Sequence, residues 1–196
     1  MTDPQPDTIQ LDDRAIRVLA HPLRSRLLGR LRIGGPATAT ELAHALGTNT
    51  GATSYHLRAL EAVGLVRDTG AGVGRRRVWQ ASSRAHSWTN SAHRDDPDTR
   101  TALDWLRRHY VRQYAERAEQ WLDAADGWPS EWADLLGASD TVLTLTAEQL
   151  QAFLDELQAL IARHRALGDG DPAARAVHLS IIGTPVELTP PAGGAA

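Results

Sequence analysis

The sequence predicts a mainly α-helical protein with a small β component, and three observations support this fold class. Residues 40–66 have the pattern of a short helix, a tight turn, a second helix and a strand. A glycine-rich turn and three consecutive arginines follow. Farther along, two long segments carry apolar residues at helical spacing. We therefore expect a winged helix-turn-helix, followed by a helical C-terminal region with a strand-helix-strand unit.

The composition excludes several classes of protein. The chain has 196 residues, of which 42% are hydrophobic, enough for one large domain or two small ones. It has no cysteine, so disulfides, thiolate metal sites and cysteine nucleophiles are excluded. The polar N-terminus does not resemble a signal peptide, and no apolar run approaches the roughly 20 residues of a membrane span. We expect a cytoplasmic protein that does not bind a membrane.

Charge is distributed unevenly along the chain. Residues 1–90 carry 12 arginines and 7 acidic residues, whereas residues 91–196 carry 9 arginines and 17 acidic residues. A basic segment joined to an acidic one predicts a half that binds nucleic acid and a half with another role.

The N-terminal half divides into an arm and a domain. Residues 1–10 are polar, and we expect a flexible arm there, followed by a DNA-binding domain over 11–84. Apolar spacing and helix-ending residues give the expected elements: helices over 11–20, 22–33, 39–46 and 50–63, and a hairpin of 65–67 with 77–80. Thr38 and Glu41 have capping-box spacing, and Asn49 is placed to cap the second helix of the motif.

The second helix of the motif has two different faces. A rotation of roughly 100° per residue puts His56, Leu60 and Val63 on the core side, flanked by Thr53 and Leu57. The opposite side is small and polar, with one cation and one amphipathic ring; it consists of Thr50, Gly51, Ser54, Tyr55 and Arg58.

This polar side suits a DNA groove. Small residues allow close approach, and Arg58 can form two hydrogen bonds to guanine. Behind the glycine-rich turn, Arg75, Arg76 and Arg77 can contact phosphates or enter a narrow minor groove. An ordinary solvated helix face is the competing interpretation for Tyr55 and Arg58. For His56, packing inside the domain is favoured over a DNA contact.

The chain resembles the ArsR-type winged-helix repressors over about 14–80. The residues that carry the resemblance are Val18 to Leu28, Leu46-Gly47, Ser54 to Leu60 and Gly64 to Val66. The resemblance implies a homodimer that binds double-stranded DNA at a two-fold operator. It also places Thr50, Gly51, Thr53, Ser54, Tyr55 and Arg58 in the recognition helix. Metal-sensing members carry a cysteine pair in the helix before the turn, and this chain has none, so soft-metal sensing is excluded.

The sequence of this half and its boundary disfavours two other ligand classes. A metal site of histidines and carboxylates would draw on the local concentration of His86, His93, Asp95, Asp96 and His109, but their spacing matches no metal motif. The glycines of 70–74 lack the full dinucleotide pattern, and no helix follows them. We expect neither a metal nor a cofactor.

The C-terminal half, 98–187, is predicted to serve dimerisation and effector binding. Asp98 is placed to cap a long helix to about 125, a short helix covers 128–136, and Thr146 caps an amphipathic helix. Strands are expected at 141–145 and 176–182, paired either in parallel within the chain or antiparallel with help from a partner subunit. A disordered tail is expected over 188–196.

Five of the six tryptophans follow residue 87. Packing in the core and in a dimer seam is the simpler interpretation. The alternative is an aromatic pocket for a small-molecule effector, formed by Trp105, Tyr110, Trp121, Trp128 and Trp132. No nucleophile stands with a base in this sequence, so an enzyme is disfavoured. The expected function is a transcriptional regulator, with a protein-interaction module that has lost DNA binding as the alternative.

Overall fold

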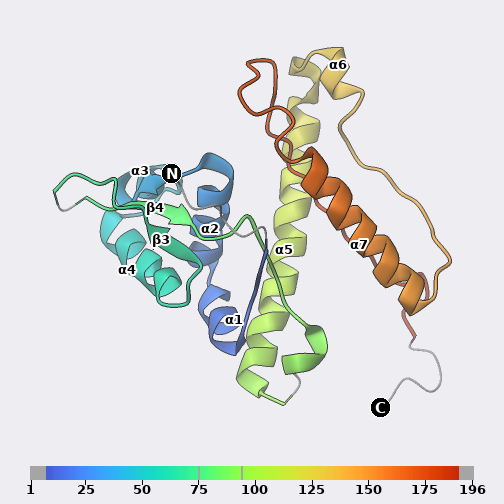
Figure 1. Ribbon diagram of the computed structural model, residues 1–196, viewed down its shortest axis with the longest axis horizontal. Coiled ribbons are helices and arrows are strands. Elements are labelled where there is room, and N and C mark those ends of the chain that lie inside the picture. Colours follow the sequence, from blue (N-terminus) through green and yellow to red (C-terminus); the bar gives the residue numbers. More distant parts are fainter. Residues whose placement is uncertain (1–7, 75, 94, 190–196) are drawn as a thin grey trace. The chain divides into compact units, whose positions relative to one another are not determined.

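The computed structural model describes residues 8–74, 76–93 and 95–189 of the chain (Figure 1). The chain forms two compact units, residues 1–115 and 116–196, and the boundary falls within one long helix. Each unit is described by itself.

The first unit contains a winged helix-turn-helix. Its elements are β1 (Thr8–Gln10), α1 (Asp13–Leu19), α2 (Pro22–Gly34), β2 (Ala37–Thr38), α3 (Ala39–Ala45), α4 (Thr50–Glu61), β3 (Val66–Asp68), β4 (Val78–Ala81), β5 (Ala85–Ser87), the 3-10 helix η1 (Asn90–His93) and the start of α5 (Pro97–Ala124). Helices α3 and α4 form the helix-turn-helix, and β3 and β4 form the wing. The predicted fold class is confirmed, with two strands of the C-terminal region as exceptions.

Local capping interactions set the ends of the two motif helices. The Thr38 hydroxyl accepts from the Glu41 backbone N–H, and the Glu41 carboxylate accepts from the Thr38 backbone N–H, which completes the predicted capping box. Gly47 adopts a φ of 62° in the turn after α3, a conformation that glycine enters without strain. Asn49 then caps α4 as predicted.

The wing belongs to a three-stranded antiparallel sheet in the order β2-β4-β3. Val66 pairs with Ala81 and Asp68 with Trp79, so the predicted hairpin is confirmed. The loop between β3 and β4 extends away from helices α2, α3 and α4 (Figure 1).

The core of the first unit is built mainly from leucines. Its buried side chains come from α1, α2, α3, α4, the sheet and the first turns of α5; among them are Ile16, Leu19, Leu27, Leu28, Leu31, Leu42, Leu57, Leu60, Leu103 and Leu106. Burial of each leucine stabilises the fold by roughly 1.5–3 kcal/mol. Because Leu103 and Leu106 are part of this core, the start of α5 is integral to the helix-turn-helix unit.

The end of the expected flexible arm is ordered, which corrects the prediction for Thr8–Gln10. These residues form β1, which pairs in parallel with β5, and the Leu11 N–H donates to the Ser87 carbonyl at 2.8 Å. The remainder of the expected arm, 1–7, lies outside the described residues.

Helix α5 begins two residues earlier than predicted. Asp96, rather than Asp98, accepts hydrogen bonds from the backbone N–H groups of Asp98 and Thr99, at 3.0 and 3.3 Å. Pro97 occupies the first helical position, where its missing N–H is harmless and its fixed φ is already helical. The cap therefore precedes the proline.

The second unit is helical. After the end of α5 it contains the 3-10 helix η2 (Ala125–Gly127), the four-residue α6 (Ser130–Ala133) and α7 (Ala147–His164). Thr146 and Gln149 form a capping box at the start of α7, so the predicted N-terminus of this helix is confirmed.

The predicted strands at 141–145 and 176–182 are wrong, because neither segment has regular secondary structure. A strand needs a neighbour that accepts and donates its backbone hydrogen bonds, and none of the described residues provides one. Of the expected tail, 188 and 189 lie outside any helix or strand, and 190–196 are outside the described residues. Among the helices that the structure describes, none is long and apolar enough to cross a membrane.

Candidate nucleic-acid interface

The start of α4 is open to solvent and firmly capped. The Asn49 side-chain oxygen accepts from the Ala52 backbone N–H at 2.8 Å. A Cβ at Gly51 would lie 3.3 Å from that oxygen, which is tighter than an ordinary contact. Glycine at this position therefore leaves the cap undisturbed and keeps the first turn of the helix small, as close approach to a nucleic acid requires.

The outward face of α4 largely matches the prediction. Thr50, Gly51, Tyr55 and Arg58 are exposed, and Ser54 is half-buried. Tyr55 has 66% of its surface accessible, so its ring is available to a partner. These residues form one polar surface along the helix.

Thr53 does not belong to this surface, which corrects its assignment as a DNA-binding residue. Its side chain is completely buried, and among the described residues its hydroxyl has no hydrogen-bond partner. The residue lies at the border between the two helix faces, where a small side chain can turn inward against the core.

His56 packs inside the domain, as predicted. It is half-buried, and its ring lies 4.4 Å from that of His21, which caps α2. Burial, and then the nearby His21 and Arg24, lower the pKa of His56. The neutral form is therefore favoured, and the ring serves the packing of α2 against α4.

An open groove of about 400 Å³ lies where α3, α4 and the wing meet. Its lining is rich in hydroxyl and guanidinium groups: Thr38, Ala39, Thr40, Thr50, Ser54, Arg58, Arg76, Arg77 and Trp79. No carboxylate is among these nine residues. Hydroxyls and guanidiniums are the groups that donate to phosphate oxygens and base edges.

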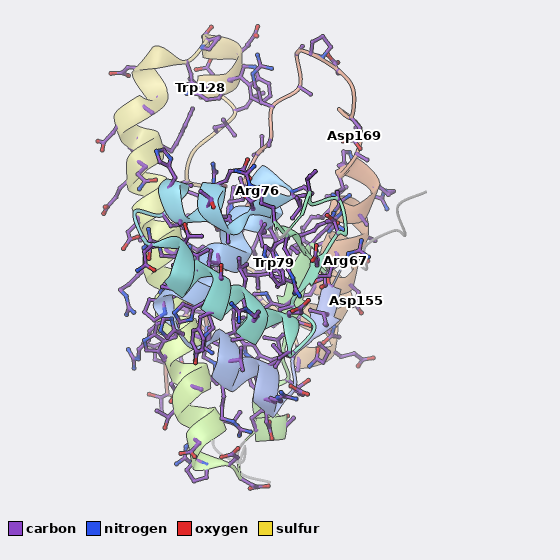
Figure 2. All side chains as sticks on the ribbon, turned by 90° about the vertical axis from the view of Figure 1, so that its left-hand side faces the viewer. Arg67, Arg76, Trp79, Trp128, Asp155 and Asp169 are labelled. Carbon is purple, nitrogen blue, oxygen red and sulfur yellow. The ribbon has the colours of Figure 1, made fainter. Side chains whose placement is uncertain are left out.

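The wing arginines differ from one another in the structure. Arg76 is exposed and lines the groove. The Arg77 guanidinium contacts the carboxylates of Glu61 and Asp68, at 3.5 and 3.4 Å, and lies 5.6 Å from the Trp79 ring centre. Arg75 lies outside the described residues. Figure 2 shows Arg76, which precedes Arg77 in the chain, and Trp79, which follows two residues after Arg77.

A glycine sets the path of the wing loop. A Cβ at Gly72 would come within 1.7 Å of the Arg76 carbonyl oxygen, which is an impossible contact. Only glycine therefore allows the two sides of the loop to approach this closely. This close approach sets the position of the Arg76 backbone at the end of the loop.

Glu41 lies beside the groove but serves the capping box. The Thr38 backbone N–H and hydroxyl each donate to its carboxylate at 2.7 Å. These hydrogen bonds, and then the charge of Arg76, lower the pKa of Glu41. Its negative charge is thereby directed to the start of α3, where the helix dipole favours it.

Four residues that line the groove were not predicted from the sequence: Thr38, Ala39, Thr40 and Trp79. The capping-box pattern predicts that a helix begins after Thr38. That prediction was the available sign that Thr38, Ala39 and Thr40 lie at a helix start beside the groove. Nothing in the sequence near Trp79 showed that β4 runs along the groove, because that depends on the pairing of β4 with β2.

The histidines and carboxylates near the boundary have separate partners. His93 pairs with Asp13, Asp96 pairs with Arg17, and His86 contacts Arg32. His109 stacks on Trp105 with ring centres 4.7 Å apart. Within the described ranges, no group of three or more such side chains is arranged to hold a metal ion.

The aromatic residues expected to form an effector pocket fall into two sets. Trp105 and Tyr110 belong to the first unit, where Tyr110 packs beside His86, Trp88 and Tyr114. In the second unit, Trp128 lies 5.5 Å from Trp121 and 6.2 Å from Trp132, both in edge-on contact. The structure therefore brings together three of the five residues as one cluster.

Comparison with known proteins agrees with the fold. Residues 19–69 match the family described as "Helix-turn-helix domain". This match covers α2, β2, α3, α4 and β3, so the predicted helix-turn-helix is confirmed. No curated protein matches the chain.

Several solved structures are similar to part of the chain. The homodimeric winged helix-turn-helix DNA-binding domain of a possible ArsR-family regulator from Mycobacterium bovis is 22% identical, over 53% of this chain and 76% of that one, with a TM-score of 0.33. An ArsR family transcriptional regulator is 28% identical over 56% of this chain and 88% of its own, with a TM-score of 0.31. Reduced HlyU from Vibrio cholerae is 21% identical over 50% of this chain and 85% of its own, with a TM-score of 0.32.

Proposed function

We propose that this winged helix-turn-helix protein is a sequence-specific DNA-binding transcriptional regulator without enzymatic activity. The observation that carries the proposal is the groove of hydroxyls and arginines, free of carboxylates, at the meeting of α3, α4 and the wing. Helix α4 would enter the major groove and present Thr50, Gly51, Ser54, Tyr55 and Arg58. Arg76 and its neighbours Arg75 and Arg77 would follow the phosphates.

We assign DNA binding to 11–84 and dimerisation, with effector binding, to 98–187. A two-fold operator would then be bound by a homodimer, and repression would follow from occlusion of a promoter in the cytoplasm. Helix α7 supports a role in association, because the apolar side chains Leu150, Phe153, Leu154 and Leu160 are each at least 40% exposed. The cluster of Trp121, Trp128 and Trp132 is the candidate effector site in this region.

Selection of genomic fragments at several salt concentrations tests the proposal. The full chain should retain specific fragments at low salt, and their affinity should fall steeply as salt rises, because contacts to phosphates release counterions. A selection that returns no retained sequence at low salt would contradict DNA binding. That result would favour a winged-helix module that binds protein.

A further inference from the structure

A second, smaller hollow lies between the end of α2 and the segment that follows β4. It has a volume of about 130 Å³. Its lining shares no residue with the groove and consists of Leu31, Arg32, Gly35, Gln80, Ala81, Ser83 and Arg84. Two arginines and no carboxylate border it.

Arg32 is held in this hollow by neutral groups. Its Nε donates to the Ser83 carbonyl at 3.0 Å, and one Nη donates to the Ser83 hydroxyl at 3.1 Å. The other Nη contacts Nδ1 of His86 at 2.6 Å. A guanidinium has five N–H donors, so these three bonds leave two of them for another acceptor.

The positive charge of Arg32 has no acidic partner among the described residues. Burial lowers the pKa of Arg32 to about 10, and the nearby Tyr110 and Tyr114 offset part of this effect. Burial, and then the charge of Arg32, lower the pKa of His86 to about 3, so the imidazole is neutral and accepts through Nδ1. Arg32 is half-buried, and a charge that is partly removed from water is stabilised by an opposite charge nearby.

The remaining lining suits an anion. Arg84 is exposed and adds a second cation at the rim, while Gln80 and Ser83 add polar groups. At roughly 30 Å³ per water molecule, 130 Å³ holds about four waters. This space is large enough for one small anion.

We propose that this hollow binds a small oxyanion, a phosphate or the carboxylate of a small acid, with the half-buried Arg32 as the counter-charge and Arg84 at the rim. Arginine suits such a ligand because its planar N–H groups match two oxygens at once. The site is separate from the groove proposed for DNA, and its occupancy does not depend on DNA binding.

Two-dimensional NMR of the full chain without DNA tests the proposal. The probes are inorganic phosphate and malonate, with sodium chloride at matched ionic strength as the reference. The backbone N–H signals of Gly35, Ala81 and Ser83 should shift and saturate with phosphate or malonate but not with chloride. The tighter of the two identifies the source of the oxyanion. Equal shifts with chloride, or shifts confined to the groove residues Thr50 and Ser54, would overturn the site.

Matched variants localise the binding. Arg84→Gln should weaken binding about fivefold, which corresponds to about 1 kcal/mol for an exposed ion pair. Arg30→Gln removes the same charge from an exposed position on α2 and should leave binding unchanged. Arg32→Met should abolish binding. If Arg32→Met does not fold, Arg84→Gln still decides, because its side chain is exposed; equal weakening by Arg84→Gln and Arg30→Gln would overturn the site.

Discussion

Arg58 and Arg76 both border the groove, yet they stand on different elements and are expected to contribute differently. Arg58→Ala should cost roughly 1–3 kcal/mol at the preferred site and relax sequence preference, because α4 is the element expected to read base edges. Arg76→Ala should weaken all sites about equally and reduce the salt slope by about 1. Fluorescence anisotropy on a selected site and a scrambled site, at several salt concentrations, separates the two effects.

Arg77→Ala is the matched control for this pair. Its guanidinium is already engaged by Glu61, Asp68 and Trp79, so its loss should affect the salt slope less than the loss of Arg76 does. Identical behaviour of the Arg58 and Arg76 variants would contradict the division between base contacts and phosphate contacts.

Thr53 offers a test of stability that does not involve DNA. Its hydroxyl is buried without a partner among the described residues, and an unsatisfied buried polar group costs about 1–3 kcal/mol. Thr53→Val keeps the shape of the side chain and should raise the free energy of unfolding by about 1 kcal/mol in urea titrations. Thr50→Val, at an exposed position on the same helix, should change it little. A destabilised Thr53→Val protein would show that the hydroxyl has a partner after all.

At the scale of elements, the carboxylate of Asp96 ties the start of α5 to α1. It accepts from the Thr99 hydroxyl and backbone N–H and from the Asp98 N–H, and it pairs with Arg17. The hydrogen bond from the Thr99 hydroxyl is the largest cause of a lowered pKa at Asp96. The backbone hydrogen bonds and the charge of Arg17 lower this pKa further, whereas desolvation raises it. The ionised form therefore stabilises the folded state.

Acid should weaken this connection. A carboxyl group with a lowered pKa contributes stability above its ordinary value of about 4, and that contribution is lost as the pH falls through the lowered value. Asp96→Asn should reduce the loss of stability on acidification, as measured by urea unfolding between about pH 2 and pH 6. Asp98→Asn, which removes an exposed carboxylate from the same turn, should keep the wild-type acid dependence; an unchanged Asp96→Asn profile would contradict the role of the cap.

The elements that the sequence predicted well are those determined by nearby residues. Capping residues and helical spacing located α3, α4 and α7 because helix hydrogen bonds join residues four apart. The parallel pair β1–β5 was missed because its partners lie 77 residues apart in register, at Thr8 and Ala85. The alternating segments 141–145 and 176–182 carry the strand pattern, but no residue in the described part of the chain pairs with them. In the groove, α4 was predictable, whereas the contribution of β4 depends on pairing.

At the scale of the whole molecule, the buried side chains among the described residues all belong to the first unit. The core extends from Leu11 to Leu106, and within the described part of 116–196 no side chain is buried. Stability is therefore distributed unevenly, since regions with few buried apolar contacts open at low free-energy cost.

Hydrogen exchange at two protein concentrations should reveal this distribution. Backbone N–H groups of α4 should be strongly protected at any concentration, because Leu57 and Leu60 anchor the helix in the core. Those of α7 should exchange rapidly in dilute protein and more slowly in concentrated protein, because association would cover its exposed leucines. Protection of α7 that does not change with concentration would contradict a role for this helix in the dimer.

The position of the core along the chain also determines which unit can fold first during translation. Leu106 is the last residue of the core, and α7 ends at His164. At usual elongation rates, the ribosome needs roughly 3–12 s to add the residues between these two points. The helix-turn-helix unit can therefore begin to fold on the ribosome before α7 is complete. A nascent chain would then carry a folded helix-turn-helix unit before it has the helix proposed for dimerisation.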